Sequence, residues 1–331
     1  RRHLRTPELR LEESVVGRRS LTKVTVCWVE GLTDPELPAR MKKRLGEIDI
    51  DGLLSPAAVE EYVTGARKTA FPLLEFTERT DHFCQGLLDG QVGLLVDGLP
   101  IGYLAPVSFG RLMRSPEDRA TDYLSASMLR ILRYLALGVS LLLPGIYAAM
   151  AMFHQQMLPT KLLLSIIESK QDVPFSTLFE VVGLLCAFEL LQQAGLHLPQ
   201  AIGTAVSIIG GLVVGTAAVD AKLVSPAALI VTASSGICGF TLPNRELSDA
   251  LRLWRLGLTV LGGVFGLFGV TAGLLLLLVR LAGLESLGRS YLAPFGEAEV
   301  KGALVRERLT EQKWRDGTLR PLDERNQRCR F

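Results

Sequence analysis

LGLTVLGGVFGLFGVTAGLLLLLVRL (residues 256–281) is the run on which the fold of this chain depends. It has 25 uncharged residues out of 26, and Arg280 is the exception. About 20 apolar residues span the hydrocarbon core of a bilayer as a helix, so this run can cross with some tilt. Hydrocarbon offers no water to backbone groups, and such a run must therefore be helical. The run predicts a membrane-spanning helix.

Further apolar runs extend this prediction to a whole domain. They are residues 128–152, 175–191, 201–219 and 224–240. Hydrophobic residues make up only 48% of the chain because its two ends have the composition of ordinary soluble protein. We therefore expect an α/β cytoplasmic domain followed by an all-α multi-pass membrane domain over residues 113–287.

Length, charge and cysteine content limit the alternatives. The 331 residues leave room for a membrane domain and one soluble domain of about 100 residues. A net charge of +2 argues against a nucleic-acid partner. Five cysteines without CxxC spacing fit a reducing compartment or a membrane better than a disulfide framework. The chain begins RRHLRTPELR, without Met, and we expect a fragment in which residues 1–19 are a linker or the remnant of a missing subdomain.

Residues 20–112 carry the signals of a small α/β domain. Alternating β-branched and aromatic residues, Pro after a capping residue, and the turn pair Asp97-Gly98 mark its strands, helices and hairpin. The predicted strands are residues 22–30, 73–78, 92–96 and 101–107. The predicted helices begin at Asp34-Pro35-Glu36, at Ser55-Pro56 and at Asp81.

The junction with the membrane domain sets its orientation. Ser115-Pro116-Glu117-Asp118 predicts a helix start that leads into the first span. Five arginines lie on the N-terminal side of that span, which places this side in the cytoplasm. They are Arg111, Arg114, Arg119, Arg130 and Arg133. Residues 288–331 are expected to be a cytoplasmic polar tail.

The number of crossings does not follow directly from the sequence. If every candidate segment crosses, the tail lies opposite the soluble domain, whereas omitting one segment returns it to the same side. Residues 245–255 are read as a charged loop. The weakest spanning candidates are 175–191 and 224–240, and either could be re-entrant inside the protein. We favour an even number of crossings with a cytoplasmic tail.

Glu180 and Glu189 are the sharpest chemical signal. An ionised carboxylate at membrane depth is costly and usually faces a bundle interior or an aqueous path, and acidic rings favour cations in pores. Nine residues at 100° each place the two on opposite faces of one helix. Lys161, Lys170 or Arg252 could provide a counter-charge. The alternative is a helix at the interface with both carboxylates solvated.

Glycines and prolines suggest packing surfaces and hinges. The predicted helix-packing glycines are Gly203, Gly210, Gly211 and Gly215, of which the last two form a GxxxG pair. The hinge candidates are Pro144, Pro159 and Pro243. The alternative is that they are ordinary helix breaks without a role in gating. We see no phosphate loop, metal-ligand spacing, GxSxG or HExxH, and expect no metal, no cofactor and no enzyme activity.

Several collinear segments resemble one family, the A subunit of bacterial spore germinant receptors, together with the related stage V sporulation protein AF. The resemblance covers residues 17–295. It includes GRRSLTKVTVCWVEGLTDPEL (17–37), GQVGLLVDGLP (90–100), SPEDRATDYL (115–124), LLLPGIYAAMAMFHQQMLPTKLLLSI (141–166), VPFSTLFE (173–180) and FTLPNRELSDALRLWR (240–255). Gln155-Gln156 departs from the Pro-acid pair expected in many relatives, which weakens any role for charge at this turn.

This resemblance implies a function. Members sit in the spore inner membrane, with a cytoplasmic N-terminal region of two α/β subdomains, of which this chain would keep the second. They work with a transporter-like B subunit and a lipoprotein C subunit, and are proposed to form a homo-oligomer that acts as a nutrient-gated cation channel. The assignment of Glu180 and Glu189 to the ion path rests only on the cost of an ionised carboxylate at membrane depth.

Other functions stay open at this point. A non-conducting scaffold would recruit partners through the soluble domain and tolerate loss of both glutamates. A secondary transporter would need an inverted repeat, which the sequence does not display. A membrane enzyme would need paired acid and base groups or a metal cluster.

Overall fold

The computed structural model describes residues 3–65, 69–197, 215–295, 304–306, 308, 314–315 and 317–326. The chain forms two compact units: unit 1 is residues 1–131 with 280–331, and unit 2 is residues 132–279. The predicted order is confirmed, because a sheet-containing domain precedes a helical region. Within the described residues, three helices are long and apolar enough to span a membrane.

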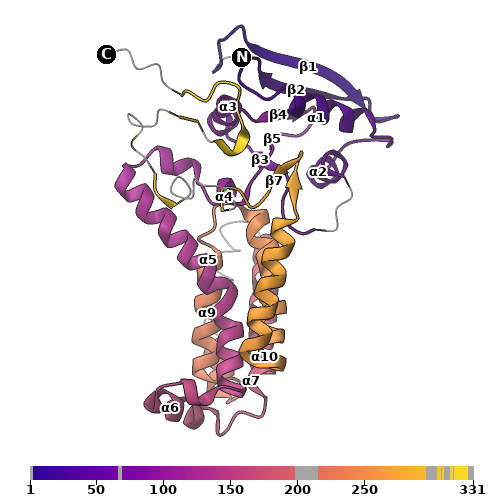
Figure 1. The fold of residues 1–331 in the computed structure, drawn as a ribbon. Coiled ribbons are helices and arrows are strands. Elements are labelled where there is room, and N and C mark those ends of the chain that lie inside the picture. The colour runs from indigo at the N-terminus through magenta and orange to yellow at the C-terminus, as the bar shows by residue number, and fades with distance from the viewer. Residues whose placement is uncertain are drawn as a thin grey trace. The chain divides into compact units, whose positions relative to one another are not determined.

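Unit 1 is built on an antiparallel sheet of order β1-β2-β4-β5-β3 (Figure 1). Its strands are β1 (Leu9–Val16), β2 (Thr22–Val29), β3 (Glu75–Thr77), β4 (Val92–Val96) and β5 (Gly102–Ala105). The predicted strands are confirmed, and β4 and β5 form the predicted hairpin.

Strand β1 corrects the sequence analysis, which assigned residues 1–19 to a linker. It pairs with β2 from Leu9 opposite Val29 to Val16 opposite Thr22. Only Val16 of its eight residues is buried. Apolar and polar residues alternate only from Leu9 to Glu12, and two further polar residues follow, so the alternation is too short to predict a strand.

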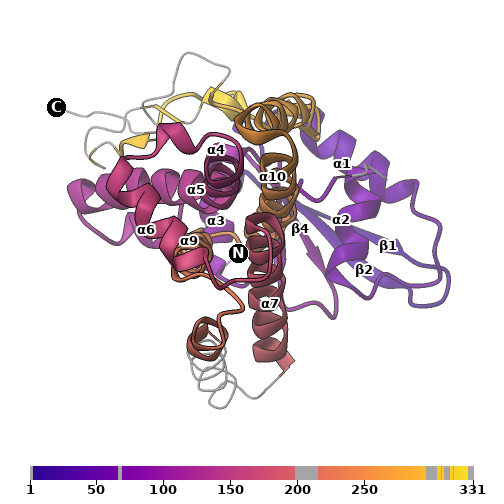
Figure 2. The same cartoon turned by 90° about the horizontal axis from the view of Figure 1, so that it is seen from below.

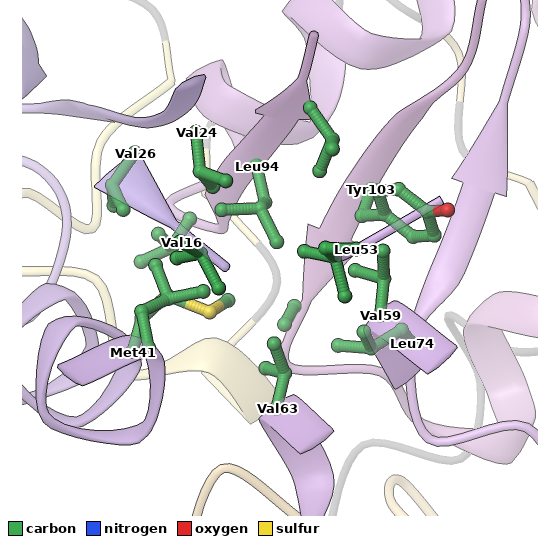
Figure 3. Packing of buried hydrophobic residues seen from close by; sticks show 14 of the residues in the cluster. Val16, Val24, Val26, Met41, Leu53, Val59, Val63, Leu74, Leu94 and Tyr103 are labelled. Carbon is green, nitrogen blue, oxygen red and sulfur yellow. The ribbon is translucent and has the colours of Figure 1, made fainter. Parts of the chain in front are cut away.

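Helices cover both faces of the sheet. Helices α1 (Glu36–Gly46) and α2 (Pro56–Thr64) pack on one face, and α3 (Thr80–Leu88) packs on the other. Figure 3 shows the first layer, where side chains from alternate strand positions meet those of α1 and α2. The labelled side chains include Val24, Val26, Leu94 and Tyr103 from strands and Met41, Val59 and Val63 from helices.

The predicted helix starts are mostly confirmed. Asp34 accepts from the N–H of Glu36 at 3.0 Å, and Ser55 caps α2 by accepting from Ala58 at 3.3 Å. Ser115 and Asp118 form a complete capping box. It caps only a 3-10 turn, Pro116–Arg119, and the first long helix begins separately at Tyr123. The predicted helix start is therefore a short turn that precedes the span, with residues 120–122 between the two.

The segment after the last helix returns to unit 1. Strands β6 (Glu285–Ser286) and β7 (Arg289–Ser290) form a small hairpin. The Ser286 hydroxyl accepts from the Val107 N–H at 2.9 Å and donates to the Leu73 carbonyl at 2.6 Å. The Tyr291 carbonyl accepts from the Phe109 N–H at 2.7 Å, and the Tyr291 side chain is fully buried. The beginning of the predicted polar tail is therefore part of a packed domain.

Unit 2 is helical. Its elements are most of α5 (Tyr123–Met152), α6 (Thr160–Lys170), α7 (Thr177–His197), α9 (Pro226–Gly239) and most of α10 (Arg245–Ala282), and residues 215–220 are also helical. Figure 2 views these helices nearly end-on, with α6 running at an angle to α5 and α7. Many large apolar side chains point outward, such as Phe179, Leu190 and Phe268, at 72%, 70% and 76% exposed. A bilayer would cover such surface.

Helix α10 differs from its prediction in two ways. The supposed charged loop 245–255 is helical and buries Leu247 and Leu251, and Asn244 caps it by accepting from the Leu247 N–H at 2.8 Å. The long apolar run is also not one straight helix. Gly266 has φ 64° and ψ −152°, and the chain reverses there.

The reversal in α10 is visible in its contacts. A Cβ placed on Gly273 would lie 2.5 Å from Leu258 Cδ2, although fifteen residues of straight helix would separate them by about 22 Å. Residues 245–265 and 267–282 thus form two arms that lie side by side (Figure 1). Glycines 262, 269 and 273 line the contact, which brings the arms close together.

Candidate functional site

Glu180 is buried near the start of α7. Its side chain has no exposed surface. One carboxylate oxygen accepts from the Ser225 N–H, and the other lies 3.3 Å from Lys170 Nζ. Lys170, at the end of α6, also donates to the Thr177 hydroxyl. The buried negative charge is thereby neutralised by a cation and a backbone donor.

Local sequence explains this arrangement. Glu180 lies in the first turn of α7, where the helix dipole favours an acid. Ser225 is the N-cap of α9, with Pro226 at the first helical position, and its hydroxyl accepts from the Ala228 N–H at 3.3 Å. Glu180 thus accepts from the backbone N–H at the start of α9. The carboxylate joins the ends of three helices.

Glu189 belongs to a second group, which we call the polar layer: Glu189, Arg252, Arg255, Ser235 and Ser140. Arg255 Nη2 donates to Glu189 Oε1 at 2.7 Å, and Arg252 Nη1 lies 3.4 Å from Oε2. Arg255 also contacts the Ser235 hydroxyl at 3.4 Å. This hydroxyl donates to the Ser140 carbonyl at 2.7 Å. The layer therefore crosses α7, α10, α9 and α5.

The two carboxylates differ in depth and exposure. Nine residues of helix separate them by about 14 Å, roughly half the thickness of a hydrocarbon core. The Glu189 side chain is 29% exposed, whereas its partner Arg255 is 5% exposed. Glu180 is therefore enclosed, and Glu189 retains an open side.

The structure tests the predicted counter-charges. Lys170 and Arg252 pair with the glutamates, as expected, whereas Lys161 is exposed. The alternative with both carboxylates solvated is wrong for Glu180. Arg255, which makes the shorter contact with Glu189, was missed because residues 245–255 were read as a loop. Its spacing of three from Arg252, beside apolar Leu251 and Leu258, was the available signal for one helix face.

The predicted packing and hinge residues have the following positions. Gly215 is buried, and a Cβ there would meet Leu229 of α9 at 3.5 Å; Gly203, Gly210 and Gly211 lie outside the described residues. Pro144 is inside α5, Pro159 precedes α6, and Pro243 lies between α9 and α10. A hinge role for these prolines stays a prediction.

Unit 1 holds a separate ionic cluster around Asp89. This carboxylate accepts from Gln85 at 2.9 Å, Arg111 at 3.1 Å and Arg119 at 3.3 Å. Burial raises the pKa of Asp89, but the two guanidinium charges outweigh burial and hold this pKa below its usual range. The cluster ties the end of α3 to α4 (Phe109–Leu112) and to the 3-10 turn that follows. Its role is structural.

A metal site is not apparent in the described ranges. They contain no group of three or more His, Cys, Asp or Glu side chains placed to hold a metal ion. The described part of unit 2 offers carboxylates, cations and hydroxyls, together with the thiols of Cys186 and Cys238 and the imidazole of His154.

Comparison with known proteins gives a consistent result. The family model described as Bacillus/Clostridium GerA spore germination protein matches residues 1–318. Spore germination protein XA of Bacillus anthracis is 34% identical over 99% of this chain and 67% of its own length. Spore germination protein KA of Bacillus subtilis is 37% identical over 92% and 57%. Membrane protein YfkQ of Bacillus subtilis is 36% identical over 95% and 62%.

One solved structure is also similar. It is the N-terminal domain of the A subunit of the Bacillus megaterium spore germinant receptor GerK3, 38% identical, covering 33% of this chain and 86% of that one with a TM-score of 0.27. The chain spans 57% to 67% of the length of the three relatives named above. The match along residues 1–318 shows that this chain belongs to the GerA spore germination protein family.

Proposed function

We propose that this chain is the part of an A-type subunit of a spore germinant receptor that contains a soluble domain and the helical membrane domain. The support is its family and the names of its relatives, spore germination proteins XA and KA. The proposed site is the spore inner membrane, with unit 1 in the cytoplasm, as the juxtamembrane arginines favour. The proposed partners are a transporter-like B subunit, a lipoprotein C subunit and further copies of this chain.

The packing of unit 1 supports a definite topology. Residues before α5 and after α10 belong to one folded unit, joined by the Ser286 contacts and by the ion pair of Arg289 with Asp34. One folded unit cannot lie on both sides of a bilayer. The chain between them must therefore cross an even number of times, and the α6 end of unit 2 lies on the opposite face after one crossing by α5.

Glu189 is the carboxylate that fits an ion path best. Its side chain is 29% exposed at a depth where an ionised acid is costly, and this single observation carries the proposal. Repeated around a homo-oligomer, such a group would line a cation passage. Glu180 is fully enclosed and is better suited to holding helix ends together.

A non-conducting scaffold is the second candidate. The observation that favours it is that both carboxylates are already paired with cations inside unit 2. A scaffold that conducts no ions needs only such internal ion pairs to hold its helices together. Under this reading Glu189→Gln leaves germination unchanged.

Ion flux separates the two candidates. The chain would be reconstituted into sealed phosphatidylglycerol and phosphatidylethanolamine liposomes that carry a K⁺ gradient. The channel proposal expects flux above empty liposomes, a several-fold loss in Glu189→Gln, and no loss in Glu168→Gln, an exposed acid of α6. Flux no greater than that of empty liposomes refutes it.

A further inference from the structure

Unit 2 has a pocket at the end where α5 stops and α7 begins. Its volume is about 330 Å³. It lies between the last turn of α5, the loop that follows and helix α6, and Thr177 at the start of α7 closes one side. Pockets of this size are at the lower end of the range for small-molecule sites. An occupant would be a compact molecule.

The pocket combines aliphatic side chains with three uncharged polar side chains, Gln155, Gln171 and Thr177, and one charged side chain. Leu158, Leu163, Ile166 and Ile167 supply aliphatic surface. Among the residues that line it, Lys170 alone carries a charge. A pocket with an aliphatic side and a single cation among its described lining residues matches an aliphatic molecule that carries one negative group.

Lys170 also connects the pocket to the buried acid. Its side chain is 20% exposed, and its Nζ contacts both the Thr177 hydroxyl and, at 3.3 Å, Glu180 Oε2. An ammonium group has three donors. One of them donates to the Thr177 hydroxyl. The contact with Glu180 Oε2 is an ion pair and not a hydrogen bond, so the ammonium group keeps donor capacity for a ligand.

We propose that this pocket binds a small aliphatic carboxylate, with its chain against Leu163 and Ile167 and its carboxylate on Lys170. The bound carboxylate shares the ammonium group with Glu180 and weakens the neutralisation of that buried charge. Occupation of the pocket is thereby coupled to the junction of α6, α7 and α9 that Glu180 holds together.

Calorimetric titration of the purified full chain in nanodiscs tests the binding. The probes are 4-methylpentanoate and the alcohol of the same skeleton, 4-methylpentan-1-ol. The carboxylate binds saturably, and the alcohol binds weaker by about tenfold or more, the scale of one charge-assisted hydrogen bond. Equal binding of the two probes, or no saturable binding of the acid, overturns the proposal.

Variants locate the binding. Ile167→Trp fills the pocket and abolishes binding, whereas Leu164→Trp, exposed on the same helix and outside the lining, leaves it unchanged. The double variant Lys170→Met with Glu180→Gln removes the cation without leaving a buried charge, and it binds acid and alcohol alike. Binding that survives Ile167→Trp overturns the proposal.

A phospholipid is the competing occupant. Native mass spectrometry distinguishes it, since a lipid lost in Ile167→Trp but not displaced by 4-methylpentanoate assigns the pocket to lipid and overturns the proposal. None of these measurements depends on ion flux.

Discussion

Glu180 is buried in unit 2 against two partners, Lys170 and the Ser225 N–H. The contribution of the ion pair to stability can be measured. Removing one member of a buried ion pair leaves an uncompensated charge, whereas removing both charges does not. The side chain is enclosed, and Lys170 is its one cationic neighbour among the described ion pairs.

Lys170→Met is expected to lower the free energy of unfolding by about 3 kcal/mol, because Glu180 stays buried without its cation. Lys170→Met with Glu180→Gln should recover most of this loss, and Lys161→Met, on the same helix and exposed, should behave as wild type. Thermal unfolding in detergent measures all three. A double variant as unstable as Lys170→Met would contradict the assignment of this pair.

Asp89 makes the stability of unit 1 depend on pH. Its folded pKa is lowered, whereas an unfolded aspartate has a pKa of about 3.9. The stabilisation is therefore fully present above about pH 4 and is lost as pH falls through the lower folded value. Asp89→Asn should unfold more easily than wild type at pH 7, and this difference should shrink below about pH 4. Urea unfolding at several pH values measures it, and a difference that is constant down to acid pH would contradict this account.

At the residue scale, the sequence predicted part of the site. It selected Glu180 and Glu189 because ionised side chains stand out within apolar runs. It also offered Lys170 and Arg252 as counter-charges, since few cations were near. It missed Arg255 because residues 245–255 were read as a loop, and the partner of Arg255 depends on which helix faces α7.

Helices and strands were predicted correctly where the local sequence carries a clear periodicity or capping signal. Strand β2 alternates buried and less buried positions, and α2 carries both a capping serine and Pro at its first position. Strand β1 has this pattern only over its first four residues and is mostly exposed. The reversal in α10 was missed, since composition reports how apolar a run is and not where its backbone turns.

Gly266 is the residue that makes this reversal possible. Its φ of 64° and ψ of −152° belong to a region that other residues rarely adopt, and a Cβ would lie 2.8 Å from the His154 ring. Gly266→Ala should therefore lose about 1–3 kcal/mol or more of stability.

Gly257→Ala is the matched control for Gly266→Ala. Gly257 lies in the same helix with no heavy atom within 4 Å of a new Cβ, so alanine there should be neutral or slightly stabilising. Thermal unfolding of the two variants in one detergent gives the comparison. Equal stability of both would mean that the chain does not reverse at Gly266.

At the scale of the whole molecule, the account joins an antiparallel sheet domain to an apolar helical unit. The sequence predicted both parts from composition and periodicity. It favoured an even number of crossings and a cytoplasmic tail, although hydropathy alone does not fix the number of crossings. The packing of residues 285–295 against residues 73 and 107–110 supports an even number of crossings, which stays a prediction.

The account's central claim is that unit 2 spans a membrane with unit 1 entirely on one face. Single cysteines at Ser14, Leu322 and Asp172, in a chain whose five native cysteines are replaced by serine, allow a direct measurement. Sealed membrane vesicles of both orientations would be treated with a membrane-impermeant maleimide. The account predicts that positions 14 and 322 react in the same orientation and position 172 in the other. Labelling of positions 14 and 322 from opposite faces, or of position 172 together with position 14, would contradict it.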